Sequence, residues 1–305
     1  MKKSKIIIIA LVAVVAVGAV AGIGVALSKK ADLIDFGEIV LDAVPEKSAE
    51  ATRVMSFNVR CKDDPEGSID NRSQIALAVI NQYAPDSFGV QEATPKWLRI
   101  FEKELGDRYA RVGESRDFFG PFSEYNCVYY LKDKYNVLDS GTFWLSETPY
   151  EKYSVSYDSL CRRIASWAVL EDKTTGEVYT HINTHLDHGK ESTRDAQSKV
   201  LLAEMNKLQT QGTVVITGDF NTFSDGDVYA SMTAGADDAA VTAETKIDAG
   251  ITYHNYGKKA DEGQGPIDFI FLTKGTKVDT YQVITAKIKD MYPSDHYPIV
   301  ADIHI

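Results

Sequence analysis

The sequence predicts an α/β fold in which two stacked β-sheets are flanked by helices. Strand-like runs of β-branched and aromatic residues recur along most of the chain, whereas only a few longer segments carry apolar residues at helical spacing. The chain has 305 residues, of which 44% are hydrophobic, and this suffices to bury the core of one large domain. Many strands with a few long helices indicate stacked sheets with helices outside them.

The expected elements begin at Arg53. Strand-like runs cover residues 53–60, 86–91, 126–131, 141–145, 163–171, 177–184, 213–218, 267–273, 278–286 and 298–305. Helix-like runs cover residues 71–83, 94–105, 191–209 and 225–233. Within 191–209, Val200, Ala203 and Leu208 recur among charged residues, as expected for a helix with one apolar face.

A basic and then apolar segment opens the chain. Residues 6–27 form a run of 22 residues without a charged or strongly polar side chain. As a helix, such a run spans roughly 33 Å, enough to cross the core of a bilayer. We therefore expect residues 1–30 to form a transmembrane signal anchor that places the domain outside the cell membrane. Ala19-Val20-Ala21 resembles a cleavage site, so secretion after cleavage is the alternative.

Residues 31–52 are acidic and contain Pro45, so we interpret them as a linker to a folded domain over residues 53–305. The net charge is -11, and because residues 1–30 hold five lysines and no acid, the remainder carries -16. A surface this acidic argues against a dedicated nucleic-acid binder, although it leaves room for a local basic groove.

The three cysteines, Cys61, Cys127 and Cys161, match no zinc-binding spacing. We interpret them as small buried residues, and one disulfide is the alternative for an exported domain.

Short polar motifs follow the apolar runs. They are Ser56-Phe57-Asn58, Val90-Gln91-Glu92, Asn183-Thr184-His185-Leu186-Asp187, Gly218-Asp219-Phe220-Asn221, Pro266-Ile267-Asp268-Phe269-Ile270 and Ser294-Asp295-His296. A sheet brings such strand ends together, so we expect one acidic pocket. Oxygen-rich pockets of this kind bind Mg²⁺ or Mn²⁺ and hydrolyse phosphoesters.

Two of these motifs suggest metal ligands. Glu92 follows a strand that looks buried, and Asn58 closes another; a solvated glutamate and a turn-forming asparagine are the ordinary alternatives. Asp219 and Asn221 lie two residues apart, so in extended backbone both side chains point to one face. Asp219 would then orient or deprotonate a water, and Asn221 would bind a phosphate oxygen.

The histidines add proton donors and acceptors. His185 follows a strand and can donate to a phosphate oxygen or a leaving group. His296 follows Asp295, and Asp268, inside an apolar run, needs a partner such as this imidazole. Arg162-Arg163 is a candidate phosphate clamp, with a surface ion pair as the alternative, and His254 is a candidate lining residue of the substrate pocket.

Together and in this order, the motifs resemble those of the endonuclease/exonuclease/phosphatase superfamily of metal-dependent phosphoesterases, over residues 53–305. Glu124-Tyr125-Asn126, Phe143-Trp144-Leu145-Ser146 and Arg163-Ile164-Ala165-Ser166-Trp167 resemble a bacterial, largely uncharacterised branch. The resemblance implies a four-layer α/β sandwich of two mostly antiparallel sheets with outer helices.

The resemblance also implies roles for the residues. Glu92 would bind Mg²⁺ or Mn²⁺ with Asn58, and Asp295 would assist near the metal. Asp219 and Asn221 would position the water and the phosphate, His185 would contact the phosphate, and Asp268 would pair with His296. Glu124 would reach the substrate. Whether Asp219 or the Asp268–His296 pair acts as the base stays open.

The superfamily does not fix the substrate, because one fold serves many phosphoesters. The acidic charge favours a small phosphoester or a phospholipid headgroup over DNA or RNA, and a nuclease is the alternative. A non-catalytic module that binds phosphorylated ligands is a less favoured third hypothesis. No protein partner is predicted.

Overall fold

The computed structural model of the protein describes residues 33–41, 44–118, 120–248, 250–259 and 265–305. The anchor expected over residues 1–30 lies outside these ranges. Within them, no helix is both long enough and apolar enough to cross a membrane.

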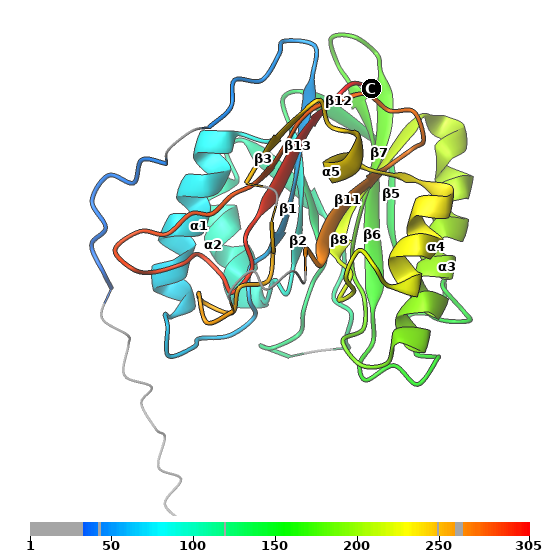
Figure 1. The fold of residues 1–305 in the computed structure, drawn as a ribbon, viewed down its shortest axis with the longest axis horizontal. Helices are drawn as coiled ribbons and strands as arrows, with labels where there is room; N and C mark the ends of the chain where they lie inside the picture. Colours follow the sequence, from blue (N-terminus) through cyan, green and yellow to red (C-terminus); the bar gives the residue numbers. More distant parts are fainter. Residues whose placement is uncertain (1–32, 42–43, 119, 249, 260–264) are drawn as a thin grey trace, which may run out of the picture. The chain divides into compact units, whose positions relative to one another are not determined.

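Two mixed β-sheets face each other at the centre of the domain (Figure 1). The seven-stranded sheet has the order β10-β12-β13-β1-β2-β4-β3, and the six-stranded sheet has the order β5-β6-β7-β8-β11-β9. Most neighbouring strands are antiparallel, but β1 runs parallel to β2, β10 to β12 and β7 to β8. The first sheet consists of β1 (Thr52–Asn58), β2 (Ser87–Gln91), β3 (Tyr109–Val112), β4 (Val128–Leu131), β10 (Thr245–Ile247), β12 (Val278–Val283) and β13 (Ile299–Ile303). The second consists of β5 (Tyr135–Trp144), β6 (Ile164–Asp172), β7 (Val178–His185), β8 (Thr213–Asp219), β9 (Asp237–Asp238) and β11 (Asp268–Leu272).

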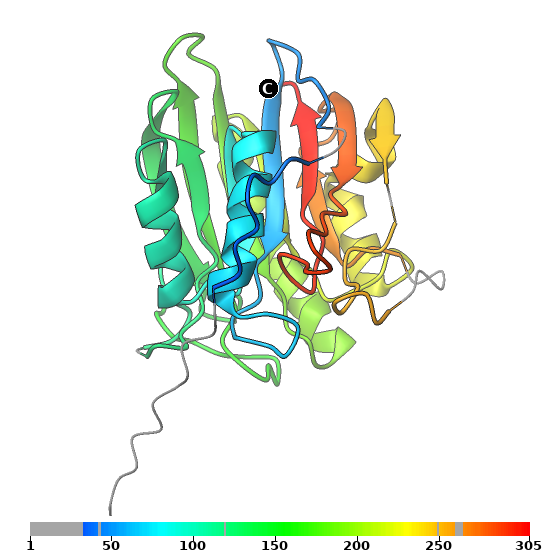
Figure 2. The same cartoon turned by 90° about the vertical axis from the view of Figure 1, so that its left-hand side faces the viewer.

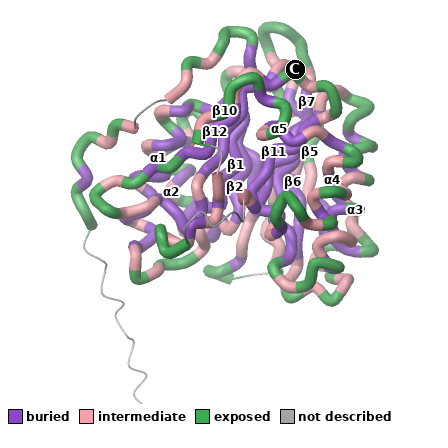
Figure 3. Tube along the Cα trace, in the orientation of Figure 1, coloured by how far each residue is buried: buried purple, intermediate pink, exposed green. Residues whose placement is uncertain are grey.

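Helices cover the outer faces of both sheets (Figure 2). They are α1 (Ile69–Tyr83), α2 (Pro95–Leu105), α3 (Glu191–Leu208), α4 (Asp227–Gly235) and the short α5 (Ala239–Thr242), with a 3-10 turn at Gln209–Gln211. Helices α1 and α2 pack on the first sheet, and α3 and α4 on the second. A third apolar cluster fills the space between the sheets, so the layers are helix, sheet, sheet, helix, with the buried strands at the centre (Figure 3).

The alternation of side chains along β1 explains this layering. Met55 and Phe57 are buried toward α1 and α2, whereas Val54 belongs to the cluster between the sheets. Because β1 is buried on both faces, side chains on both of its sides contribute buried apolar surface, which stabilises the fold by roughly 25 cal/mol per Å². Gly89 in β2 lies where the two sheets approach each other closely, because a Cβ there would lie 2.2 Å from Thr217 Oγ1 and 2.3 Å from Asn183 Oδ1.

The predicted fold class is confirmed, with two mixed sheets flanked by helices. All four predicted long helices form. The sequence pattern missed the short strands β3, β9 and β10 and the start of β5, which was expected only over residues 141–145. The first part of β5 is an edge with mostly exposed side chains and a register shift between Val137 and Asp139, so it lacks the apolar alternation that marks a strand.

The described part of the expected linker, residues 33–41 and 44–51, lies against the domain. Asn71 of α1 accepts from the backbone N–H of Ile34 at 2.8 Å, and Gln82 accepts from that of Leu41 at 2.8 Å. Phe36 is buried, and Lys47 forms an ion pair with Asp86 at 2.6 Å. Amide side chains of α1 therefore bind the backbone of this segment in an extended form (dark blue in Figure 2).

Candidate active site

The polar residues that follow the strands converge on one pocket of about 510 Å³. Strands β1 and β2 run parallel in one sheet, as do β7 and β8 in the other, so each pair delivers its carboxyl ends to the same edge. The lining carries charged, amide and imidazole side chains from strand ends and from the loops beside them: Arg60, Glu92, Arg116, Glu124, Arg163, His185, His188, Asp219, Asn221, Lys259, Asp295 and His296.

Three of these residues adopt left-handed backbone within two residues of a strand end. The φ angles are 63° at Arg60, 59° at Glu92 and 49° at Asn221. Such angles are uncommon for residues with a Cβ and cluster at functional sites, where the surrounding structure sustains them. The turn at each position ends the strand and points the side chain into the pocket.

The buried guanidinium of Arg72 holds the loops around the pocket together. It donates to the carbonyl oxygens of Val59 (2.8 Å), Arg60 (3.3 Å), Lys62 (2.6 Å) and Pro293 (3.2 Å). The loop after β1 and the loop that carries Asp295 thus share one anchor on α1. Only arginine supplies this many donors in a fixed geometry.

His296 lies between two carboxylates. Its Nδ1 is 2.8 Å from Asp268 Oδ2, and its Nε2 is 3.7 Å from Asp219 Oδ2. Burial opposes the charged imidazole, but the negative charges of Asp268 and Asp219 outweigh it and raise the pKa of His296 to about 10. Burial and the charge of Asp268 raise the pKa of Asp219 to about 7. A protonated His296 therefore neutralises a buried pair of acids.

Asp219, at the end of β8, accepts hydrogen bonds from residues at or just after strand ends of both sheets. Asn58 Nδ2 donates to Asp219 Oδ2 at 3.0 Å and to Glu92 Oε1 at 3.1 Å, and the backbone N–H of Asn221 donates to Asp219 Oδ1 at 2.9 Å. The carbonyl oxygen of the Asn58 amide, which is the atom that ligates metals, accepts from the backbone of Arg60 at 3.1 Å. Asn58 thus links Glu92 to Asp219 through its nitrogen.

His185 has a defined tautomer. Asn221 Nδ2 donates to His185 Nε2 at 3.0 Å and to the carbonyl oxygen of Leu186 at 3.1 Å. Because Nε2 accepts, the ring proton lies on Nδ1, which is buried and has no hydrogen-bond partner among the described residues. Burial, with the nearby charges of Arg163 and Arg116, lowers the pKa of His185 well below its usual range. The neutral imidazole of His185 thus carries one buried N–H that has no partner among the described residues.

Glu92 and Asp295 face each other across the guanidinium of Arg60. Arg60 Nη1 lies 3.6 Å from Asp295 Oδ2 and 4.0 Å from Glu92 Oε2, and the backbone N–H of Cys61 donates to Glu92 Oε2 at 3.0 Å. Burial raises the pKa of Asp295. Burial also acts to raise the pKa of Glu92, but the hydrogen bonds from Cys61 and the charges of His296 and Arg60 outweigh it and lower this pKa.

The donor set fits a hard divalent cation. Four carboxylates line the pocket, and burial raises the pKa of three of them, Glu124, Asp219 and Asp295, above their usual range. Carboxylate oxygens are the ligands that Mg²⁺ and Mn²⁺ prefer, and a bound cation would offset the cost of keeping these buried carboxylates charged. Ligand atoms of Asp219, Asp268 and His296 also lie within 4.8 Å of one another. Asp219 therefore belongs both to this cluster and to the carboxylates that line the pocket.

The neighbouring residues Arg162 and Arg163 point in different directions. Arg163 is 4% exposed and lines the pocket, and its Nε and Nη1 have no hydrogen-bond partner among the described residues. Arg162 points elsewhere, since its Nε donates to the carbonyl oxygen of Tyr153 at 2.6 Å. The two-arginine clamp expected from the sequence is therefore a single arginine. Glu124 lines the pocket as expected and pairs with Arg116 at 2.8 Å.

His254 does not line the pocket, contrary to the expectation from the sequence. It is 1% exposed, stacks on Tyr297 with ring centroids 3.8 Å apart, and accepts from the backbone N–H of Gly257 at 3.0 Å. Its neighbour Tyr253 lines the pocket instead and contacts His296. Adjacent residues in extended backbone face opposite sides, and a bridge between Tyr253 and His296 fixes which side faces the pocket.

Several lining residues escaped the sequence analysis, among them Arg60, Arg116, His188, Tyr253 and Lys259. Arg60 follows Asn58 by two residues, so the alternation after a strand end was a usable signal. His188 follows Asp187 within one of the polar motifs. The other three lie in loops, where no periodicity indicates direction. The three cysteines are free, and only Cys127 is fully buried.

Comparison with known proteins identifies the family of this chain. The family model described as "Endonuclease/Exonuclease/phosphatase family" matches residues 55–296. An endonuclease/exonuclease/phosphatase from Bacteroides vulgatus is 32% identical in sequence, with a TM-score of 0.78, and the match covers 84% of this chain and 99% of that one. The mannosyl-6-phosphatase Bt3783 from Bacteroides thetaiotaomicron is 25% identical, with a TM-score of 0.77 and coverages of 83% and 100%.

More distant structures share the fold alone. The human Nocturnin catalytic domain is 18% identical, with a TM-score of 0.61 and coverages of 85% and 96%. No functionally curated protein matches the sequence. The motifs, the fold and the family match together show that this chain belongs to the endonuclease/exonuclease/phosphatase family, whose members are phosphoesterases.

Proposed function

We propose that the protein hydrolyses phosphomonoesters of small, polar molecules and requires Mg²⁺ or Mn²⁺. The observation that carries the proposal is His296 held between Asp268 and Asp219 in a pocket whose lining residues His185 and Arg163 carry buried donors without partners among the described residues. Such a pocket supplies a proton acceptor, fixed positive charge and hydrogen-bond donors for the equatorial oxygens of a phosphoryl group.

Each side chain has a role in this proposal. Glu92 and Asp295, with Asn58 or Asp219 completing the set, would hold the divalent ion, which when bound withdraws charge from the phosphoryl oxygens. Asp219 accepts the proton of the attacking water, because its pKa of about 7 suits a base at neutral pH. His296 stays protonated beside it, and Asp268 fixes the imidazole. His185, Asn221 and Arg163 bind the phosphoryl oxygens.

The choice of a small substrate rests on size and on a relative. A cavity of about 510 Å³ accommodates a molecule such as a sugar phosphate. The Bacteroides thetaiotaomicron relative named as a mannosyl-6-phosphatase supports the same class of substrate. The net charge of -16 outside residues 1–30 argues against a nuclease.

A phospholipid headgroup is a second candidate, favoured by exposed aromatic residues beside the pocket. Phe118 and Phe122 are 70% and 81% exposed, and they lie in the same loop as Arg116 and Glu124 of the pocket. We further propose that residues 1–30 anchor the protein in the cell membrane with the domain outside, which would suit a lipid substrate. Membrane fractionation of the full chain tests the anchor, and recovery of intact protein in the soluble fraction would contradict it.

The test of function uses residues 33–305, which form one compact unit. Solved relatives are matched almost end to end by 83–84% of this chain, which supports independent folding. The fragment is assayed with Mg²⁺ or Mn²⁺ against hexose phosphates, p-nitrophenyl phosphate, bis-p-nitrophenyl phosphate, sphingomyelin, phosphoinositides, plasmid DNA and RNA, with Asp219→Ala as control.

We expect metal-dependent turnover of the monoesters that the variant loses. Preferred turnover of a lipid, lowered by Phe122→Ser, would select the second candidate, and preferred turnover of DNA or RNA would select a nuclease. Saturable binding of phosphorylated ligands without product would indicate a non-catalytic module.

A further inference from the structure

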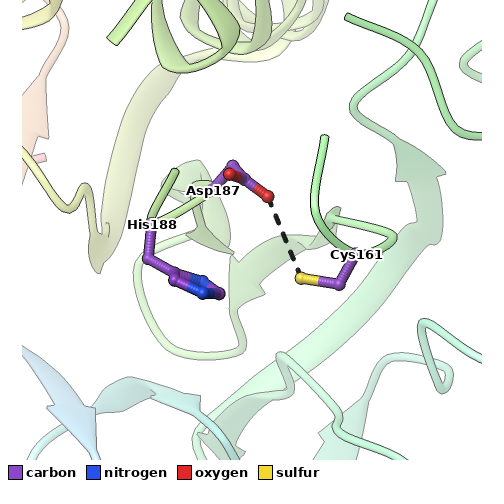
Figure 4. Close-up of side chains that lie close together, drawn as sticks. All are labelled: Cys161, Asp187 and His188. Carbon is purple, nitrogen blue, oxygen red and sulfur yellow. Dashed lines mark hydrogen bonds between the residues drawn. The ribbon is translucent and has the colours of Figure 1, made fainter. Parts of the chain in front are cut away.

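We infer that Cys161, Asp187 and His188 form a second metal site, selective for a thiophilic divalent ion such as Zn²⁺ or Cd²⁺ (Figure 4). One ligand atom from each residue lies within 4.8 Å of the other two, and Cys161 Sγ is 3.9 Å from Asp187 Oδ2. Zn²⁺ accepts this combination of thiolate, carboxylate and imidazole, whereas Mg²⁺ prefers oxygen ligands alone. The site is thus chemically distinct from the all-oxygen set at Glu92 and Asp295.

The sheet topology creates this cluster. Cys161 precedes β6, and Asp187 and His188 follow β7. Antiparallel pairing of Ala165 with Thr184 places the start of β6 beside the end of β7. The ligands therefore come from two loops whose separation is fixed by a buried ladder, which is the rigid support that a metal site needs.

Asp187 is a buried acid whose carboxylate is held by hydrogen bonds from neighbouring loops. It is 0% exposed, and its carboxylate accepts from Ser159 Oγ at 2.9 Å, from the backbone N–H of Leu160 at 3.0 Å and from that of Gly189 at 2.7 Å. Burial acts to raise its pKa, but hydrogen bonds from Gly189 and Ser159, the positive charge of Arg163 and a hydrogen bond from Leu160 outweigh this and lower it. Buried charges are normally paired or bound to a metal. The same three hydrogen bonds hold the carboxylate in position as a ligand.

Cys161 and His188 supply the open side of the site, since both line the pocket and Asp187 does not. The Cys161 thiol has Asp187 as its only hydrogen-bond partner within the described chain. A metal ion would replace the thiol proton, which passes to solvent. Three protein ligands leave the fourth tetrahedral position directed at the pocket, where water or an anion completes the coordination.

Arg163 competes for the same imidazole. Its Nη2 donates to His188 Nδ1 at 3.0 Å, so that nitrogen holds the lone pair of the neutral ring. A neutral imidazole has one such lone pair, and a metal ion on His188 therefore displaces the guanidinium. Occupancy of the site is consequently coupled to Arg163, and removing the guanidinium should tighten metal binding.

The experiment titrates Cd²⁺ into residues 33–305 in excess Mg²⁺ and follows the ultraviolet charge-transfer absorption of the cadmium–thiolate bond. The readout does not depend on activity. Cys161→Ser, His188→Gln and Arg163→Gln are compared with Cys61→Ser, which removes the other half-buried thiol of the same pocket.

We expect one equivalent of Cd²⁺ with a thiolate signal that Cys161→Ser abolishes and Cys61→Ser retains. His188→Gln should weaken binding at least tenfold, and Arg163→Gln should strengthen it. Absence of the signal in the native protein, or its loss in Cys61→Ser alone, would overturn the site. Equal affinity in His188→Gln and the native protein would also overturn it, because a lone thiol would then bind the ion.

Discussion

His296 Nδ1 lies 2.8 Å from Asp268 Oδ2, although the two residues are 28 positions apart in the chain. Asp268 opens β11, and the backbone of β11 is paired with β8 so that Asp268 lies opposite Asp219. The ladder thus fixes both acids, and the loop before β13 brings His296 to them. This contact orients the second ring nitrogen toward Asp219, at 3.7 Å.

Replacing either member of this pair should lower turnover. We expect His296→Gln to reduce kcat by roughly 10³-fold, because Asp219, the proposed proton acceptor, loses the imidazolium that balances its charge, and positioned acid–base groups contribute about 10²–10⁴-fold. Asp268→Asn should reduce it by roughly 10²-fold or more, since Asp268 acts through the imidazole. The double variant should be no worse than His296→Gln, because residues that act as a unit are not additive. Steady-state kinetics on the best substrate measure all three, and multiplicative losses would show that the two residues act separately.

The same pair predicts how stability changes with pH. The folded-state pKa of His296 is raised from 6.5 to about 10, so its contribution to stability is fully present below pH 6.5. It is lost as the pH rises through the folded value, between 6.5 and about 10. Thermal unfolding in EDTA, measured from pH 6 to pH 10, should show a steeper fall in Tm for the native protein than for His296→Gln. Parallel curves would mean that His296 is not protonated between the acids.

Removal of Arg163 should weaken substrate binding selectively. Its Nε and Nη1 are buried and have no hydrogen-bond partner in the part of the chain that the structure describes, and hydrogen bonds to a charged group contribute about 1.5–3 kcal/mol each. We expect Arg163→Gln to raise KM for a phosphomonoester by roughly 10- to 100-fold. Arg162→Gln is the matched control, because its side chain points to Tyr153 and away from the pocket. An equal effect of both variants would indicate a general charge effect.

Much of this site could be predicted from the sequence, because strand ends are recognisable. Asp219 and Asn221 follow an apolar run at a spacing of two, and Asp268 required a partner because it interrupts another run. Arg116 and Lys259 were not predictable, since they lie in loops without periodicity. The sequence analysis selected His254 as a lining residue, whereas its neighbour Tyr253 lines the pocket. Alternation along a segment predicts two opposite faces but does not indicate which of them faces the pocket. That choice depends on the tertiary bridge between Tyr253 and His296.

The approach of the two sheets at Gly89 gives a prediction for stability. A Cβ at this position would meet Asn183 and Thr217 at 2.3 Å or less, and both are fully buried. We expect Gly89→Ala to destabilise the fold by more than about 4 kcal/mol, or to prevent soluble expression. Gly235→Ala is the control, because its new methyl group meets only the flexible end of Leu202 at 3.0 Å. Chemical denaturation compares the two, and similar midpoints would show that the sheets can separate without cost.

Arg60 gives the sharpest prediction for the divalent ion, because its guanidinium lies between Glu92 and Asp295, the two proposed ligands. A positive charge there competes with Mg²⁺ for the same carboxylates. Arg60→Gln should therefore tighten Mg²⁺ or Mn²⁺ binding by up to roughly tenfold, whereas Glu92→Gln should weaken it by at least that factor. Lys62→Gln is the control, since this exposed lysine pairs with Asp64 outside the pocket.

Calorimetry at fixed ionic strength measures the three affinities, and activity separates two consequences of removing Arg60. If the guanidinium only repels the metal, Arg60→Gln should need less Mg²⁺ for half-maximal rate and keep kcat. If it moves onto the phosphoryl group when the metal binds, kcat should fall while metal affinity rises. Unchanged affinity in Arg60→Gln together with unchanged affinity in Glu92→Gln would place the ion away from both residues, beside Asp219, Asp268 and His296, whose ligand atoms lie within 4.8 Å of one another.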